Sequence, residues 1–223
     1  MAKFTRLKVY EKIKETGLVP LFYNADAETV KQVVTACYNG GARIFEFTNR
    51  GDGAYEVFVE LLKFANNELP EMIIGVGSVE DAATAAVYMM AGANFIVSPI
   101  LNPEMAKVCN RRKVAWMPGC SDLNDIAHAE ELGAEIVKIF PAVQVGGPAF
   151  IKSIKAPRPW TSIMPSGGVD ITEDNLKLWF SAGAFCVGMG SKLVTKEIVA
   201  AKDWDKITAR VKMVLSTIKE LRG

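Results

Sequence analysis

The hydrophobic positions of this chain fall in short apolar runs separated by longer, more polar segments. The runs are rich in β-branched and aromatic residues and end at glycine, proline or polar turn-forming residues, a pattern that predicts buried strands alternating with helices. Eight strands are predicted in this way, and a further helix precedes the first. They cover Leu18–Phe22, Ala42–Phe47, Met72–Val76, Asn94–Ser98, Val114–Met117, the run around Lys138, Ser162–Met164 and Phe185–Val187.

Three of the helices between these strands carry N-terminal signals. Asp26 is predicted to cap the helix that runs to Tyr38. The segment Ser78-Val79-Glu80-Asp81 has the form of a capping box, which predicts the start of the helix that ends at Ala91. Ser121 is predicted to cap the helix Asp122–Leu132.

A Gly-Ala pair recurs before every second predicted strand. The pairs are Gly41-Ala42, Gly92-Ala93, Gly133-Ala134 and Gly183-Ala184, and each follows a helical pattern. A helix often ends in the left-handed conformation that glycine adopts without steric cost. Four βαβα units in succession predict an α/β fold of the (β/α)₈ TIM barrel type with an extra N-terminal helix, formed by residues 1–223 as a single domain. An open doubly wound sheet is the alternative, but it usually carries a GxGxxG loop, and the sequence has none.

Composition narrows the functional classes. Lys and Arg total 26 against 25 Asp and Glu, which argues against a nucleic-acid partner, and no apolar run is long enough to span a bilayer. The N-terminus lacks the apolar stretch of a signal peptide. The four cysteines are scattered without a CxxC pair, as expected of reduced thiols in a cytoplasmic protein. With one histidine, His128, in a polar helical pattern, neither a metal site nor a cofactor is predicted.

The central candidate for chemistry is Lys138, in the middle of the apolar run from Glu135 to Ala142. Burial of an ammonium group is costly, so a buried lysine tends toward the neutral form. A neutral amine is a nucleophile that forms a Schiff base with a carbonyl. The alternative is a lysine whose stem packs at a strand edge while its ammonium group reaches water.

Glu46 is the second candidate, because side chains alternate along a strand. Ile44, Glu46 and Thr48 share one face of their strand, and the phenylalanines between them suit the side facing the helices. The same alternation turns Lys138 inward, so that a carboxylate and an amine are expected to face each other across the barrel mouth. The alternative is a buried ion pair with a structural role only.

Glycines follow several predicted strands. They occur in Gly75-Val76-Gly77-Ser78, Pro118-Gly119, Ser166-Gly167-Gly168 and Gly188-Met189-Gly190-Ser191. Glycine lets backbone N–H groups approach a ligand closely, and the loops after the seventh and eighth strands of a barrel are its usual phosphate site. These loops therefore predict a ligand site at the mouth with a phosphate-binding end.

Taken in order, these motifs resemble the family of 2-keto-3-deoxy-6-phosphogluconate (KDPG) aldolase and 4-hydroxy-2-oxoglutarate (KHG) aldolase. The resemblance runs from about Leu18 to Val194. It rests on Val19-Pro20, Glu46-Phe47-Thr48-Asn49-Arg50, Gly75-Val76-Gly77-Ser78, Ser98-Pro99, Pro118-Gly119, Lys138-Ile139-Phe140-Pro141-Ala142, Pro165-Ser166-Gly167-Gly168 and Gly188-Met189-Gly190-Ser191. It implies a metal-independent class I aldolase, commonly a homotrimer, that releases pyruvate from a 2-keto-3-deoxy sugar acid in the Entner–Doudoroff branch of carbohydrate metabolism.

The resemblance also assigns roles to residues. Lys138 would form the Schiff base and Glu46 would act as general acid and base. The substrate would contact Arg50, Ser78, Pro99, Phe140 and Ser166, with the carboxylate held by Arg50, Ser78 and Ser166. The phosphate would bind Gly167, Gly168, Gly190 and Ser191.

The chain departs from the family pattern at three positions. Serine replaces the usual threonine at Ser78 and Ser166, and Asn49 stands where leucine is common. The hydroxyl groups are kept, so the reaction is expected to survive, whereas the preferred 2-keto-3-deoxy acid and its stereochemistry at C4 stay open. Two other functions also stay open: a phosphosugar isomerase or epimerase with Glu46 as base, and a non-catalytic barrel that binds a phosphorylated sugar acid. Cys120, beside the predicted mouth, is a candidate reactive thiol.

Overall fold

The computed structural model describes residues 1–223 and alternates parallel strands with helices along almost the whole chain. It therefore has the predicted α/β fold. The strands are β1 (Leu18–Phe22), β2 (Ile44–Thr48), β3 (Ile73–Gly77), β4 (Phe95–Val97), β5 (Ala115–Met117), β6 (Gly119–Cys120), β7 (Val137–Ile139), β8 (Ile163–Pro165) and β9 (Val187–Met189).

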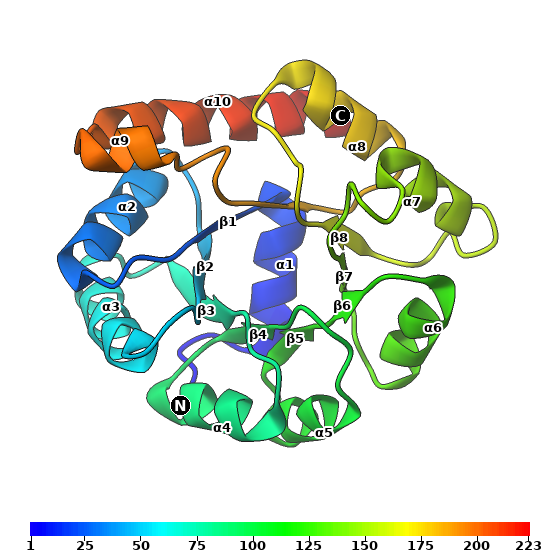
Figure 1. Ribbon diagram of the computed structural model, residues 1–223, viewed down its shortest axis with the longest axis horizontal. Helices are drawn as coiled ribbons and strands as arrows, with labels where there is room; N and C mark the ends of the chain where they lie inside the picture. Colours follow the sequence, from blue (N-terminus) through cyan, green and yellow to red (C-terminus); the bar gives the residue numbers. More distant parts are fainter.

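Helices α2 to α10 lie outside the strands, whereas α1 crosses behind the centre of the ring (Figure 1). The helices are α1 (Arg6–Thr16), α2 (Ala27–Asn39), α3 (Ala54–Glu68), α4 (Ala82–Ala91), α5 (Pro103–Arg112), α6 (Leu123–Glu131), α7 (Gly147–Lys155), α8 (Glu173–Ser181), α9 (Lys196–Ala200) and α10 (Trp204–Arg222). None of them is long and apolar enough to cross a lipid bilayer.

The strands form two sheets, not one continuous closed ladder of eight. Six strands follow the order β5-β4-β3-β2-β1-β9, and the other three follow the order β6-β7-β8. The predicted fifth strand corresponds to β5, and a short strand that was not predicted, β6, follows it after Pro118, which has no N–H group to donate to the ladder. The two sheets also approach each other at an isolated parallel bridge between Ser166 and Gly188.

The Gly-Ala repeat ends helices, as predicted, and it also explains where the strands begin. All four glycines have positive φ angles, between 85° and 114°. The N–H group of each following alanine donates back to a carbonyl of the preceding helix, as in Ala42 to Cys37 at 3.0 Å and Ala93 to Tyr88 at 3.0 Å. These alanines therefore belong to the helix end, and β2 begins at Ile44, two residues later than predicted.

Two predicted helix starts were wrong. Asp81, not Ser78, is the N-cap of α4, and its side chain accepts a hydrogen bond from the Thr84 N–H group. Asp122, not Ser121, likewise caps α6. In both cases a carboxylate closer to the helix takes the capping role, which leaves Ser78 free at the end of β3. The prediction that Asp26 caps α2 is confirmed.

Two hydrophobic cores hold the molecule together. The larger core lies between the strands and the outer helices and includes Phe45 and Phe47. The smaller core lies inside the ring, where Ile44 meets Val9 and Ile13 of α1 together with inward side chains of the other strands. Helix α1 thus closes the ring at the end where the strands begin, and the Tyr10 hydroxyl accepts a hydrogen bond from the Trp116 N–H group at 3.2 Å there.

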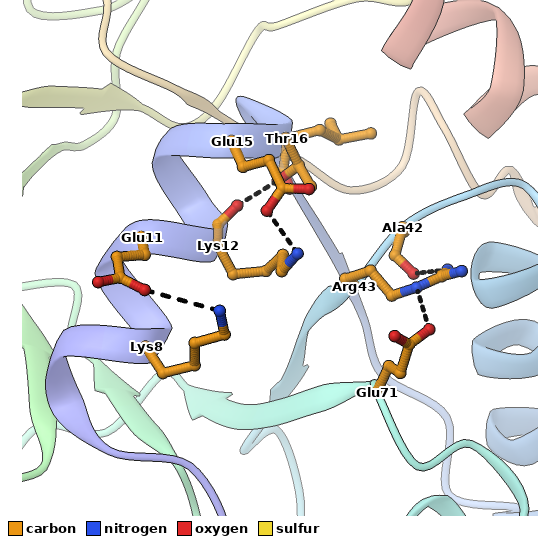
Figure 2. A network of polar contacts seen from close by, with 9 residues as sticks. Lys8, Glu11, Lys12, Glu15, Thr16, Ala42, Arg43 and Glu71 are labelled. Atoms are coloured by element: carbon orange, nitrogen blue, oxygen red, sulfur yellow. Dashed lines mark hydrogen bonds and ion pairs between the residues drawn. The ribbon is translucent and has the colours of Figure 1, made fainter.

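The closed end carries exposed ion pairs (Figure 2). Lys12 pairs with Glu15 on α1, and Arg43 Nε lies 3.3 Å from a carboxylate oxygen of Glu71. The glutamate side chains are 65% and 69% exposed, so each pair stabilises the fold by at most about 1 kcal/mol. Most of the buried polar side chains lie in the strands or at the end of the ring where the strands finish. They are Glu46, Thr48, Ser98, Lys138 and Ser166, whereas Asn94 and Thr161 precede β4 and β8.

Candidate active site

Strand β2 turns Glu46 toward the interior of the ring. Its neighbours Phe45 and Phe47 belong to the outer core, and the Phe47 and Phe58 rings lie 6.0 Å apart. Ile44, on the same face as Glu46, belongs to the inner core. The predicted alternation is therefore confirmed for β2.

Strand β7 orients Lys138 in the same way. Val137 and Ile139 pack in the outer core, whereas Ile136, on the lysine side, packs in the inner core. Lys138 is 6% exposed and Glu46 is 1% exposed. The lysine is thus an interior residue of the ring, not a strand-edge residue with its ammonium group in water.

The electrostatics of the two groups favour their neutral forms. Burial lowers the pKa of Lys138, while the charge of Glu46 opposes this shift and that of Arg50 adds to it. Burial raises the pKa of Glu46, against the opposing charges of Lys138 and Arg50. Neither Lys138 nor Glu46 takes part in an ion pair of the structure, and Oε2 of Glu46 is buried without a hydrogen-bond partner. The buried ion pair considered from the sequence is therefore absent from the structure.

Phe140 and Ser166 border Lys138. The Lys138 Nζ atom lies 4.8 Å from the centre of the half-buried Phe140 ring. Ser166 is buried, and its N–H group donates to the carbonyl of Ile139 at 3.0 Å. The Phe140 ring therefore lies beside the amine, and the Ser166 backbone is hydrogen-bonded to the strand that carries Lys138.

The glycines of β3 have a different purpose from the one predicted. A Cβ atom added at Gly77 would lie 1.8 Å from Oε1 of Glu46, and one added at Gly75 would lie 2.4 Å from the Phe95 ring. These glycines make room for side chains of the protein, not for a ligand. Gly77 in particular leaves the space that the Glu46 carboxyl group occupies.

Gly77→Ala is therefore expected to displace the Glu46 carboxyl group. If Glu46 has its predicted role as general acid and base, a misplacement of its carboxyl group by about 1 Å would lower the rate by about 10²-fold, so we expect kcat to fall by that order. The matched control is Gly75→Ala, two residues away, whose added methyl group meets Phe95 instead. This control is expected to lower the melting temperature but to leave kcat close to that of the parent. A Gly77→Ala enzyme with the parent kcat would contradict the role of this glycine.

Three further predicted residues follow the ends of β2, β3 and β4. Arg50 is exposed, but its charge acts on both Glu46 and Lys138. Ser78 is half-buried with a φ of 56°, which is uncommon for a residue other than glycine. Pro99 is half-buried, and its carbonyl lies where a Cβ atom at Gly119 would be.

The predicted site did not include Thr48, nor the hydrogen bonds of Asn49 that hold the loop after β2 in place. Thr48 is buried at 2% exposure and shares the inward face of Glu46, so the alternation of the strand was the signal that pointed to it. The neighbouring Asn49 accepts a hydrogen bond from the Tyr88 hydroxyl at 2.8 Å, and its N–H group donates to the carbonyl of Gly77 at 2.8 Å. Asn49 thereby ties the loop that carries Arg50 to α4 and β3.

The loops after β8 and β9 lie next to each other. Ser166 pairs with Gly188, and its carbonyl accepts a hydrogen bond from Ala142 at 2.9 Å. Gly167 is half-buried and has a φ of 94°. Gly168 and Ser191 are exposed, and Gly190 is half-buried. Gly167 and Gly168 thus adjoin the segment that follows Lys138, whereas Gly190 packs against Leu21 of β1.

Other candidate groups do not join this site. Burial raises the pKa of Cys120 to about 12, so its thiol is not a reactive thiolate near neutral pH. His128 lies exposed on α6, and no group of three or more His, Cys, Asp or Glu side chains is arranged to hold a metal ion. The groove of about 510 Å³ between α7 and α8 lies outside the strands.

Known proteins resemble this chain over nearly its full length. A family model described as "Aldolase: KDPG and KHG aldolase" matches residues 9–210. The 2-dehydro-3-deoxy-phosphogluconate aldolase of Haemophilus influenzae is 30% identical over 97% of this chain and 99% of its own. The KHG/KDPG aldolase of Escherichia coli is 30% identical over 89% of this chain and 91% of its own.

Solved structures agree with these sequence matches. The 2-keto-3-deoxy-6-phosphogluconate aldolase of Zymomonas mobilis, solved with 3-phosphoglycerate, superposes with a TM-score of 0.78 at 27% identity, over 94% of this chain and 95% of that one. The KDPG aldolase of Legionella pneumophila shares the fold, with a TM-score of 0.82 at 24% identity over 91% of this chain and 96% of that one. With an inward-facing buried lysine and glutamate at the open end of its strands, this chain belongs to the KDPG and KHG aldolase family.

Proposed function

We propose that this chain is a class I aldolase that cleaves KDPG to pyruvate and glyceraldehyde 3-phosphate, with Lys138 as the Schiff-base residue. The observation that carries the proposal is the buried Lys138, which faces the interior of the ring and has a lowered pKa. The charge of the buried Glu46 carboxyl group acts on this pKa, and the charge of Lys138 acts on that of Glu46. KHG, which would give pyruvate and glyoxylate, is a second substrate, in line with the name of the Escherichia coli relative.

The first step is attack of the neutral Lys138 Nζ on the C2 ketone of the substrate. The resulting carbinolamine loses its hydroxyl group as water, and Glu46 supplies the proton for that departure. A carboxyl group whose pKa is raised by burial keeps its proton to a higher pH, which suits it to this role. The product of this step is a protonated imine between C2 and Lys138.

The second step is cleavage of the C3–C4 bond. The ionised Glu46 carboxylate removes the proton of the C4 hydroxyl group, C4 becomes the aldehyde carbon, and the bonding electrons move through C3 to the iminium nitrogen to form an enamine. Glu46 then returns a proton to C3. Hydrolysis of the imine releases pyruvate and restores Lys138.

The remaining predicted residues bind the two ends of the substrate. Arg50 is suited to the carboxylate, because its planar guanidinium group matches a carboxylate in a bidentate manner. Ser78 and Ser166 add hydroxyl groups, and Phe140 and Pro99 pack against the carbon chain. The phosphate group binds at Gly167, Gly168, Gly190 and Ser191, in the loops that follow the last two strands, where barrels usually bind phosphate. The Zymomonas mobilis relative was solved with a phosphorylated acid, 3-phosphoglycerate.

The test is release of pyruvate, coupled to lactate dehydrogenase, with KDPG and with KHG as substrates. Turnover of KDPG supports the proposal. Conversion of a sugar phosphate to its isomer without pyruvate would point to an isomerase or epimerase instead. Binding of KDPG without any turnover would point to a non-catalytic barrel, and either result would contradict the aldolase.

The strands are further proposed to work as a closed (β/α)₈ barrel formed by residues 1–223 as one domain. Hydrogen bonds across both gaps between the sheets support closure: Lys138 N–H donates to the Pro118 carbonyl at 2.8 Å, and Phe185 N–H donates to the Ile163 carbonyl at 2.8 Å.

A chain that forms a single domain should unfold in one cooperative transition, in which the changes in far-UV circular dichroism and in tryptophan fluorescence coincide. Two separate transitions would contradict it.

The enzyme is also proposed to be a homotrimer of the cytoplasm. Ile100, Leu123 and Val143 follow β4, β6 and β7 and are 48%, 44% and 49% exposed, as expected where subunits pack together. Light scattering should then give three times the chain mass of 24.3 kDa, whereas a mass equal to one chain would contradict the trimer.

The proposed location in the cytoplasm is supported by the cysteines, because all four are free and buried, as suits a reducing compartment. Cell fractionation that finds the protein elsewhere would contradict that location.

A further inference from the structure

An ion pair joins the two loops that carry the proposed phosphate residues. The Lys192 Nζ atom lies 3.6 Å from Oδ2 of Asp170. Asp170 follows Gly168 by two residues in the loop after β8, and Lys192 directly follows Ser191 in the loop after β9. The pair therefore stands at the phosphate end of the site.

The carboxylate of this pair is fixed, whereas the ammonium group is free to move. Oδ1 of Asp170 accepts a hydrogen bond from Thr172 N–H at 3.3 Å, and the Asp170 N–H group donates to the Asn175 side chain at 2.8 Å. The Lys192 carbonyl accepts from the Arg210 side chain at 3.2 Å, which holds the backbone, while the Lys192 side chain is 61% exposed. The Lys192 side chain can thus change its rotamer, and so move its ammonium group, without movement of the loop backbone.

The charge of the two loops is otherwise negative. Lys192 is the only cationic side chain in residues 166–174 and 188–194, whereas Glu173 and Asp174 of the first turn of α8 accompany Asp170. An exposed ion pair stabilises little against water, so a phosphate dianion at Gly168 and Ser191 would draw Lys192 away from Asp170. Asp170 would oppose this by attracting Lys192 and by repelling the dianion.

We propose that the Asp170–Lys192 pair sets the affinity of the enzyme for the phosphate end of its substrate. Lys192 binds the phosphate group, and Asp170 is a positioning residue that competes with the phosphate for Lys192. The pair therefore tunes discrimination between phosphorylated and unphosphorylated substrates, an inference that rests on the proposed aldolase function and on the location of its phosphate site.

The test is a pair of single substitutions with opposite expected effects. Lys192→Met is expected to raise the KM for KDPG by about tenfold, and Asp170→Asn to lower it by about threefold, with kcat changed by less than about twofold in both. Asparagine keeps the side-chain oxygen that accepts from Thr172, so the loop is preserved. The control is Lys196→Met, which removes the same charge from an exposed lysine at the start of α9.

Pyruvate separates this test from that of the aldolase itself, because pyruvate carries no phosphate. The pyruvate concentration that half-saturates borohydride trapping should be the same in the parent and in all three variants. Failure of the parent to trap pyruvate would overturn the proposed function. Normal trapping combined with an unchanged KM for KDPG, or with KM shifts in the same direction for both pair variants, would overturn the role of the pair.

Discussion

Lys138→Met is expected to lower kcat/KM for cleavage of KDPG by at least about 10⁴-fold, as removal of a nucleophile does in other enzymes with covalent intermediates. Methionine has a side chain of similar length but no amine, so neither the carbinolamine nor the imine can form. Without the imine, the electrons of the C3–C4 bond have no acceptor. The coupled pyruvate assay measures the loss.

The fold is expected to survive this substitution. A buried amine is destabilising relative to an apolar side chain of similar volume, and Lys138 is 6% exposed. The melting temperature of Lys138→Met should therefore equal or exceed that of the parent. Lys63→Met makes the same substitution on the exposed side of α3 and should keep full activity. Residual cleavage within tenfold of the parent would show that Lys138 is not the nucleophile.

Glu46→Gln is expected to lower kcat by about 10² to 10⁴-fold, the usual range for removal of a general acid–base group. Glutamine has the same shape but cannot take or return a proton. Protonation of the enamine at C3 has a direct measure, because it exchanges the methyl protons of pyruvate with deuterium in heavy water. The parent should catalyse this exchange, and Glu46→Gln should slow it by a similar factor.

The Glu46→Gln enzyme should still form the covalent adduct with pyruvate, although more slowly, since Lys138 is unchanged. Glu56→Gln is the matched control, because Glu56 is an exposed residue in the first turn of α3. It should exchange the methyl protons of pyruvate at the parent rate. Exchange at the parent rate in Glu46→Gln would mean that another group protonates the enamine.

Much of the fold follows from local patterns in the sequence. Apolar runs gave the positions of the strands, and the Gly-Ala pairs marked helix ends at Gly41, Gly92, Gly133 and Gly183, all with positive φ angles. What the patterns missed depends on competition between neighbouring groups. Serine and aspartate are both favourable N-cap residues, and only the folded backbone determines that Asp81 is the N-cap of α4.

The break between the two sheets has a similar origin. Pro118 is visible in the sequence, but a proline at a strand end and a proline that divides a strand look alike there. The structure resolves the difference, because β5 before Pro118 pairs with β4, whereas Gly119 and Cys120 after it pair with β7.

The candidate site was predictable wherever it depends on strand alternation. The inward faces of Glu46 and Lys138 follow from a period of two and need no tertiary information. The functions of Gly75 and Gly77 did not follow, because the groups that fill their space, Phe95 and Glu46, come from other strands. The Asp170–Lys192 pair was invisible for the same reason, since it joins two loops that are separate in the sequence.

The most direct measurement is the intact mass of the protein after incubation with pyruvate and borohydride, followed by peptide mapping. A gain of one reduced pyruvate per chain, located on Lys138 and absent from Lys138→Met, is the expected result. A parent protein without an adduct, or with the adduct on another lysine, would contradict the assignment of Lys138 as the Schiff-base residue.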